Sequence, residues 1–232
     1  MKKYILYLLL IFTCQLFAQK YKITYSFSLN IDADTIKNQD KKYYYKNYFL
    51  SQYQNSYGVL WINKEGAFFE QEGNLKNLYY DNNYITTFYS SVKYKKIIKE
   101  NSSTLFPDAP PYMYYSFSDF NWKITNQSKK INNYVCYKAI GNLKPLNPNL
   151  PNYYFEAWFS PEIPLQYGPN GYGGLPGLIF EIYFLDGTGV HWKLKSIDKG
   201  TFKSIIFPDF NNSENYTQSY KRTYDFFQKL KK

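Results

Sequence analysis

The sequence predicts a mainly β protein: an antiparallel meander that forms a curved sheet or half-open barrel, followed by a C-terminal amphipathic helix. Short runs of alternating apolar and polar residues are separated by glycine and asparagine, a pattern typical of strands joined by turns. The 28 tyrosines and 19 phenylalanines fit a pleated, half-buried surface. With 232 residues, 44% of them apolar, the chain can build one substantial core. We therefore expect residues 19–232 to form a single β-rich domain.

The alternation is clearest at the start of this expected domain. Residues 20–29 place aromatic and aliphatic side chains on one face and lysine, serine and threonine on the other. Residues 179–185 and 190–197 flank a turn with two glycines and predict a hairpin. The spacing of further expected strands favours an antiparallel meander. These strands are 42–53, 57–63, 66–71, 75–80, 83–90 and 92–99.

Residues 214–230 follow a different period. Their apolar positions recur at the spacing of one helix face: Tyr216, Tyr220, Tyr224, Phe227 and Leu230. Basic residues gather near the end of this segment, where they suit the helix macrodipole. We expect one amphipathic helix packed against the sheet, with a role at a membrane surface as the alternative.

The first 18 residues have the pattern of a secretory signal peptide. Lys2 and Lys3 precede an apolar run at 4–12, and Ala18 supplies a small residue for cleavage. This pattern predicts export through the Sec route to the periplasm, to the outer membrane or out of the cell. The alternatives are an uncleaved anchor and a lipoprotein signal that is acylated at Cys14.

Cleavage after residue 18 would leave a single cysteine, Cys136, so no intrachain disulfide is expected. Cys136 lies in an alternating apolar stretch, which favours a buried thiol over a nucleophile. Residues 163–180 carry no charge, but three prolines and five glycines would break a membrane helix there. We therefore expect no transmembrane segment in the mature chain.

The charge balance limits the partners. The formal net charge is +10, and it falls to +8 when Lys2 and Lys3 are removed. Lysines beside tyrosines would suit single-stranded nucleic acid. However, Arg222 is the one arginine, and an exported protein seldom meets nucleic acid, so we expect no nucleic-acid partner. A solvated lysine face is the favoured interpretation, and binding to an anionic envelope surface is the alternative.

An ordered set of short motifs occupies the second half of the chain. It comprises Cys-Tyr-Lys-Ala at 136–139, Ala-Trp-Phe at 157–159, Pro-Glu-Ile-Pro at 161–164, Gly-Pro at 168–169 and Gly-Gly-Leu-Pro-Gly-Leu-Ile at 173–179. This order resembles the GLPGLI family of exported Bacteroidota proteins, named after the hexapeptide that stands here at 174–179. The resemblance implies export but no established activity. Residues 140–151 lack the Phe-Arg-Gly-Arg-like element that the family usually carries.

The candidate site residues are those of the family motif: Gly173, Gly174, Leu175, Pro176, Gly177, Leu178 and Ile179. Proline at the second position and glycine at the third position of 175–178 predict a type II turn. The two glycines before it permit close approach of the backbone. Because the motif has no ionisable or nucleophilic group, we interpret it as a rigid corner of a buried hairpin. A rim on which a ligand or partner backbone docks is the alternative.

Catalytic patterns are sparse. His191 is the single histidine, and a zinc site around it would need several carboxylates. Glu156 and Glu181 could form a glycosidase-like acid and base, with Glu162 nearby in the sequence. The sequence contains no nucleophile elbow, phosphate-binding loop or calcium loop. We therefore expect no catalytic residue, no metal and no cofactor.

Three functions remain. The favoured one is a non-catalytic exported envelope protein that binds an apolar or lipid-like ligand in its curved sheet, which predicts a large aromatic-lined cavity. The second is a protein-interaction accessory of an outer-membrane receptor, which predicts an exposed apolar or aromatic patch. The third and least favoured is a carboxylate-based hydrolase, which predicts a cleft with clustered carboxylates of perturbed pKa.

Overall fold

The computed structural model describes residues 20–29, 39–44, 56–72, 87–100, 109–143, 152–185, 189–200 and 204–230. The predicted signal peptide, Cys14 and the expected strand at 75–80 lie outside these ranges. Within the ranges, no helix has both the length and the apolar character needed to cross a bilayer.

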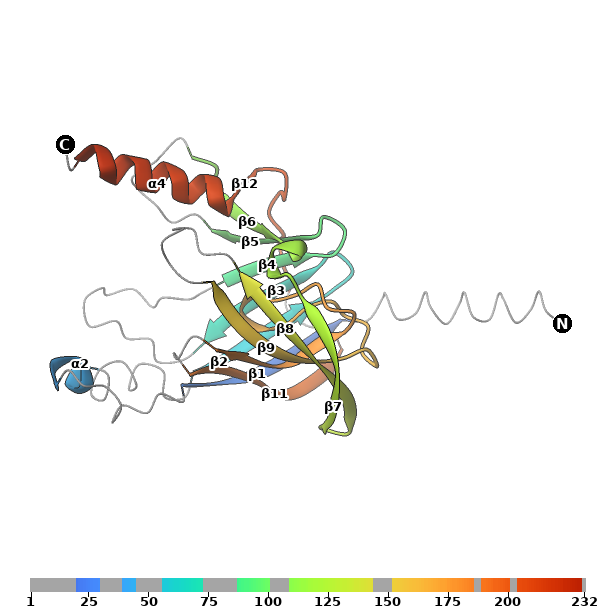
Figure 1. Cartoon of the computed structure of the whole chain (residues 1–232). Coiled ribbons are helices and arrows are strands. Elements are labelled where there is room, and N and C mark those ends of the chain that lie inside the picture. Colours follow the sequence, from blue (N-terminus) through green and yellow to red (C-terminus); the bar gives the residue numbers. More distant parts are fainter. Residues whose placement is uncertain are drawn as a thin grey trace.

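The described strands form one sheet of twelve, and eleven of them make up two meanders (Figure 1). The first meander holds β1 (Tyr21–Leu29), β2 (Tyr57–Ile62), β3 (Ala67–Glu72), β4 (Thr87–Ser91), β5 (Lys96–Glu100) and β6 (Tyr112–Ser116). The second holds β7 (Lys123–Ile131), β8 (Tyr134–Leu143), β9 (Tyr153–Ser160), β10 (Leu178–Phe184) and β11 (Val190–Lys199). Each strand lies beside its sequence neighbour within its meander, and these pairs are antiparallel.

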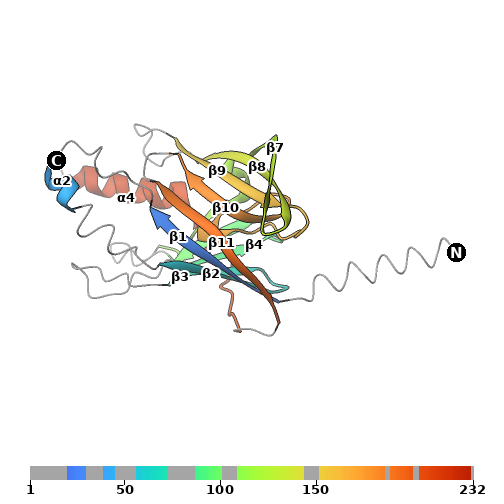
Figure 2. The same cartoon turned by 90° about the horizontal axis from the view of Figure 1, so that it is seen from below.

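Strand β1 joins the two meanders, because it pairs with β2 on one side and with β11 on the other. The sheet curves around a concave side, with β2 and β3 facing β8 and β9 across it (Figure 2). As the alternation predicts, Tyr21, Ile23 and Tyr25 of β1 are buried while the residues between them are half-exposed. The predicted curved meander and the predicted hairpin of β10 and β11 are confirmed.

The C-terminal segment closes the edge of the first meander. A short strand, β12 (Ser213–Asn215), pairs in parallel with β6, and the helix α4 (Tyr216–Leu230) follows it directly. The side chain of Asn215 accepts a hydrogen bond from the backbone N–H of Thr217 at 2.9 Å, which caps the helix. The ring of Tyr216 stacks on Tyr115 of β6 with 4.4 Å between centroids. The predicted C-terminal helix is therefore present and packs on the β6 edge.

Two expected strands differ from the structure. Residues 42–44 end a short helix, α2 (Gln39–Tyr44), so the expected strand at 42–53 is wrong at its start, and residues 45–53 lie outside the described ranges. Residues 92–95 form the turn between β4 and β5, with Lys95 at φ 52°. Tyrosine and lysine are tolerated in strands, helices and turns, so their alternation alone does not separate these states.

Candidate functional site

The residues between β9 and β10 occupy the concave side of the sheet. This stretch, residues 161–177, is called the inner segment here. Its four prolines and five glycines prevent a continuous strand or helix. Its regular structure is one short turn of 3₁₀-helix, η4 (Pro169–Gly171), and an isolated antiparallel bridge between Tyr167 and Gly173. The η4 turn packs against β2, β3 and β4. The inner segment therefore leaves the second meander and contacts the first one across the concave side.

Aromatic rings hold the other side of the inner segment. Tyr172 contacts the rings of Phe120, Phe155 and Phe184 at centroid distances of 5.1, 4.9 and 5.6 Å. The indole N–H of Trp122 donates to the carbonyl of Gly173 at 2.9 Å. Stacked and edge-on rings contribute beyond their buried area. These contacts anchor the inner segment to β9, β10 and the η3 turn (Phe117–Phe120).

The family motif forms the last part of the inner segment and the start of β10. The N–H of Gly177 donates to the carbonyl of Leu175 at 2.8 Å, which closes a γ-turn centred on Pro176. Gly177 does not have the positive φ that a type II turn requires, so the predicted turn type is wrong. The glycine is needed for space instead, because a Cβ at Gly177 would overlap the carbonyl oxygen of Ser160.

The glycines before this turn behave as the sequence predicts. Gly174 has φ 88°, and a Cβ there would lie 2.9 Å from the Cβ of Phe117. Its N–H donates to the carbonyl of Gln166 at 3.0 Å. Of the motif, Leu175, Leu178 and Ile179 are buried, whereas Pro176 is exposed.

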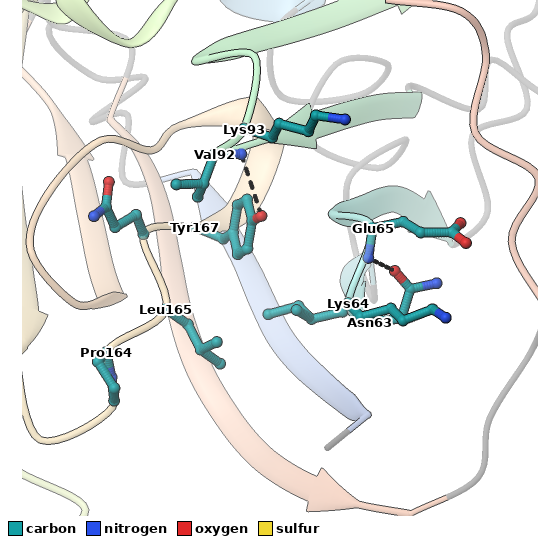
Figure 3. Close-up of a pocket in the computed structure, with 10 residues that line it drawn as sticks. Asn63, Lys64, Glu65, Val92, Lys93, Pro164, Leu165 and Tyr167 are labelled. Carbon is teal, nitrogen blue, oxygen red and sulfur yellow. Dashed lines mark hydrogen bonds between the residues drawn. The ribbon is translucent and has the colours of Figure 1, made fainter. Parts of the chain in front are cut away.

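A pocket of about 310 Å³ opens where the inner segment meets two hairpin turns (Figure 3). It is called the mouth pocket here. Ile62 and Tyr167 are its buried floor, and Leu165 and Val92 form its apolar walls. The hydroxyl of Tyr167 accepts a hydrogen bond from the N–H of Val92 at 3.4 Å, which joins the inner segment to the β4–β5 turn.

The rim of the mouth pocket is polar. Lys64 and Glu65 of the β2–β3 turn and Lys93 of the β4–β5 turn line it. Figure 3 shows both the Glu65 carboxylate and the Lys93 side chain extending away from Tyr167, and the backbone N–H of Glu65 donates to Asn63 Oδ1 at 2.8 Å. An apolar floor with two lysines among the rim residues suits a ligand with an apolar body and an anionic group.

Sequence reasoning missed this pocket. Its lysines lie in two separate turns and its floor comes from β2 and the inner segment, so no local pattern connects them. The sequence gives one indication of the inner segment: residues 161–168 mix apolar and polar side chains with proline and glycine. This mixture indicates an irregular but partly buried segment.

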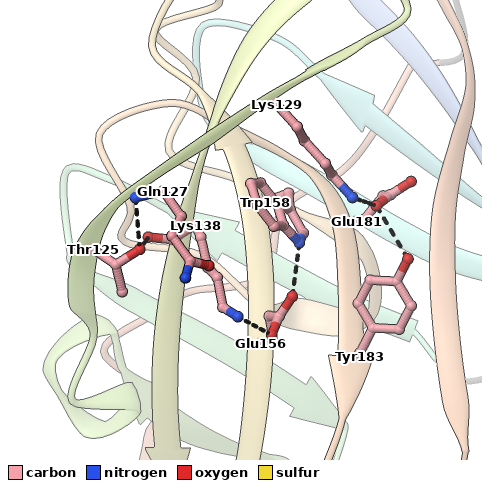
Figure 4. A network of polar contacts seen from close by, with 8 residues as sticks. All are labelled: Thr125, Gln127, Lys129, Lys138, Glu156, Trp158, Glu181 and Tyr183. Atoms are coloured by element: carbon pink, nitrogen blue, oxygen red, sulfur yellow. Dashed lines mark hydrogen bonds and ion pairs between the residues drawn. The ribbon is translucent and has the colours of Figure 1, made fainter.

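The predicted carboxylate pair lies elsewhere, on the outer face of the second meander (Figure 4). Glu181 is buried, and its Oε2 accepts hydrogen bonds from Lys129 Nζ at 2.6 Å and from the Tyr183 hydroxyl at 3.2 Å. Glu156 pairs with Lys138 at 2.6 Å and accepts a hydrogen bond from Trp158 Nε1 at 2.8 Å.

These carboxylates are paired, and neither of them lines the mouth pocket. The phenol of Tyr183 has its pKa raised to about 12, first by burial and then by the charge of Glu181. It therefore remains a neutral hydrogen-bond donor at physiological pH. The arrangement has the character of a structural ion-pair network that joins β7 to β10.

Cys136 and His191 lie beside this network. Cys136 is fully buried, and burial raises the pKa of its thiol to about 12, with the charge of Glu181 adding to the effect. A thiol with this pKa stays protonated at neutral pH, so the interpretation as a buried small hydrophobe is confirmed. The ring of His191 stacks on the ring of Tyr183 with 3.8 Å between centroids. The side chains of His191 and the buried Trp192 therefore lie on opposite faces of the sheet. Across the described ranges, no group of three or more His, Cys, Asp or Glu side chains is placed to hold a metal ion.

The family comparison covers the inner segment and the strands on either side of it. A family model described as "Protein of unknown function (Porph_ging)" matches residues 151–181, which run from β9 through the motif to β10. No curated protein matches the chain. Two solved structures of PNGF-II, in space groups C2 and P21, align with a TM-score of 0.49 and 16% identity over 88% of this chain. The alignments cover 32% and 33% of the PNGF-II chains, so this chain spans about a third of their length.

Proposed function

We propose that the protein is a non-catalytic exported envelope protein of the GLPGLI type that binds a small amphiphilic ligand with an anionic group in the mouth pocket. The observation that carries this proposal is that the buried Ile62 and Tyr167 line the same pocket as Lys64 and Lys93. The volume of about 310 Å³ lies at the lower end of the range of small-molecule sites.

The inner segment fills the concave side of the sheet, and this limits the size of the ligand that the protein can bind. A carrier of a whole lipid needs an open apolar cavity, but here the inner segment occupies the space between the meanders. The mouth pocket has room for one short acyl chain or a comparable apolar group. The ligand class is therefore a single-chain or smaller amphiphile with a carboxylate, sulfate or phosphate head.

The test compares decanoate with decan-1-ol, which share an apolar chain and differ in charge. We expect decanoate to bind the protein at least about tenfold more tightly than decan-1-ol, because a charge-assisted contact to a lysine is worth more than a neutral one. In the Lys64→Glu/Lys93→Glu variant this preference should disappear. Titration calorimetry measures both ligands.

The matched control is Lys95→Glu/Lys195→Glu, which changes the net charge equally at two exposed lysines outside the mouth pocket. It should keep the preference for decanoate. Equal loss of the preference in both variants would mean that long-range charge, and not the pocket, attracts the ligand. No binding of decanoate by the wild type at millimolar concentration would overturn the proposal.

One observation supports the alternative function, a protein-interaction accessory of an outer-membrane receptor. Tyr153, Tyr154 and Leu185 are 41%, 46% and 54% exposed at neighbouring ends of β9 and β10, where the N–H of Leu185 donates to the carbonyl of Tyr154. An exposed group of this kind favours a protein contact. It becomes the leading explanation if the mouth pocket binds no amphiphile. The hydrolase is the least favoured function, because Glu156 and Glu181 are held in ion pairs.

A further inference from the structure

A second pocket lies further along the inner segment, at residues 170–172. It has a volume of about 170 Å³ and is called the concave pocket here. Its walls are largely aromatic: Phe88, Ile97 and Tyr115 come from the first meander, Phe120 from η3 and Tyr172 from the inner segment. Leu143 of β8 adds a contribution from the second meander. It shares no lining residue with the mouth pocket.

The backbone of the inner segment is shaped to form this pocket. Gly171 has φ 76°, and a Cβ there would lie 2.7 Å from Cδ1 of Phe88. Asn170, which also lines the pocket, has φ 52°. Two successive residues in the left-handed region let the segment turn tightly against β4 and β5.

The size and the walls indicate one aromatic ring as the occupant. An apolar cavity of about 150 Å³ is large enough to hold benzene. Phe88, Phe120 and Tyr172 offer ring faces and edges to such a guest. A long acyl chain is too large for the space.

Lys99 supplies a charge next to this pocket. It lies two residues after Ile97 on β5, so both side chains point to the concave side. Its Nζ lies 5.8 Å from the centroid of Phe88, a wall of the pocket. Within the described ranges Lys99 has no acidic partner, and burial lowers the pKa of its ammonium group.

We propose that the concave pocket binds a small aromatic carboxylate, with Lys99 as the counter-ion of the carboxylate. A half-buried ammonium that lacks an acidic partner among the described residues is unfavourable, and an anion that reaches it would remove this cost. The aromatic walls select the ring, and Lys99 selects the charge. This site is additional to the mouth pocket and does not depend on it.

The test uses phenylacetate as the probe and benzyl alcohol as its neutral counterpart. We expect the wild type to bind one phenylacetate, about tenfold or more tightly than benzyl alcohol, in calorimetry or ligand-observed NMR. Lys99→Met should weaken phenylacetate binding about tenfold or more and leave benzyl alcohol unchanged. Lys99→Arg should keep most of the affinity, because it keeps the charge.

The matched control is Lys195→Met, at an exposed lysine of β11, which should bind phenylacetate like the wild type. Folding of each variant is checked by thermal unfolding, and the comparison of the two probes on the wild type needs no variant at all. Equal binding of the two probes, or unchanged phenylacetate binding in Lys99→Met, would overturn the proposal. Decanoate binding should respond to Lys64→Glu/Lys93→Glu and not to Lys99→Met, so the two proposals can fail separately.

Discussion

Tyr25 forms a hydrogen bond between β1 and β10, which are far apart in the chain. Its side chain is fully buried, and its hydroxyl donates to the carbonyl of Ile179 at 2.7 Å. The bond joins β1 to the last residue of the family motif. Burial raises the pKa of Tyr25 well above its ordinary value, so the phenol remains a neutral donor. The first strand of the sheet therefore helps to position the motif.

The titration of His191 makes the free energy of unfolding decrease as the pH falls. Burial lowers the pKa of His191, while the carboxylate of Glu181 opposes the shift. The unfolded chain binds this proton near pH 6.5, and the folded protein binds it at a lower pH. The contribution of His191 to stability is therefore fully present above about pH 6.5 and is lost as the pH falls through the folded pKa.

The variant His191→Phe keeps a ring on Tyr183 and removes the titration. We expect its free energy of unfolding to fall less than that of the wild type between about pH 6.5 and 5, by on the order of 0.5 kcal/mol because the ring is partly exposed. Urea unfolding at several pH values measures the difference. Because the chain has a single histidine, no other imidazole titrates in this range. Parallel pH curves for the two proteins would contradict the expectation.

Among the elements, β7 is one of the two outer strands of the described sheet. Its lysines discourage pairing with another chain. Lys129 of β7 also reaches over the ring of Trp158 at 4.2 Å to pair with Glu181 of β10. The ion pair between Lys129 and Glu181 therefore holds β7 against the rest of the sheet.

The motif turn is the element on which the inner segment depends. We expect Gly177→Ala to lower the free energy of unfolding by about 2–3 kcal/mol, because the new Cβ would overlap the carbonyl of Ser160 and strain a packed corner. Pro176→Ala, at the exposed neighbour, should cost about 1 kcal/mol or less, since it removes only the fixed φ. Chemical denaturation measures both variants.

The same pair of variants separates the two interpretations of the motif. A rigid corner predicts the large loss of stability in Gly177→Ala. A docking rim predicts instead that Gly177→Ala unfolds like the wild type and loses a bound ligand or partner.

At the scale of the whole molecule, the curved sheet is held in shape from two directions. The pairing of β1 with β11 joins the meanders along their length, and the inner segment joins them across the concave side. The space that a large ligand would need is thereby used for the core. Within the described part of the chain, two smaller pockets lie along the inner segment, and they differ in their walls and in the charge beside them.

Export is also a property of the whole molecule, and it remains a prediction. We expect the protein isolated from the cell envelope or the medium to begin at Gln19, because the residues before it have the pattern of a cleaved signal peptide. Intact-mass measurement and N-terminal sequencing test this. Lys2→Glu/Lys3→Glu should retain the uncleaved chain in the cytoplasm. A mass that includes an acyl group on Cys14 would contradict cleavage after Ala18.

The candidate sites show where sequence reasoning ends. Cys136 could be assigned as buried from its apolar neighbours alone, and the glycines of the motif indicated a tight corner. The turn type at 175–178 could not be assigned, because the carbonyl of Ser160, 17 residues away from Gly177, decides why glycine stands there. The lysines of the two pockets could not be assigned either, since Lys64, Lys93 and Lys99 look like any solvated lysine in the sequence.

The sequence by itself determined the β-rich class, the alternating strand β1, the hairpin of β10 and β11 and the C-terminal helix, because alternation and helical spacing act between near neighbours in the chain. The tertiary structure alone decided that β1 pairs with β11, that residues 161–177 turn inward, and which lysines stand beside pockets. Those features depend on contacts between residues that are distant in the chain, where packing and burial of charge have no local pattern to mark them.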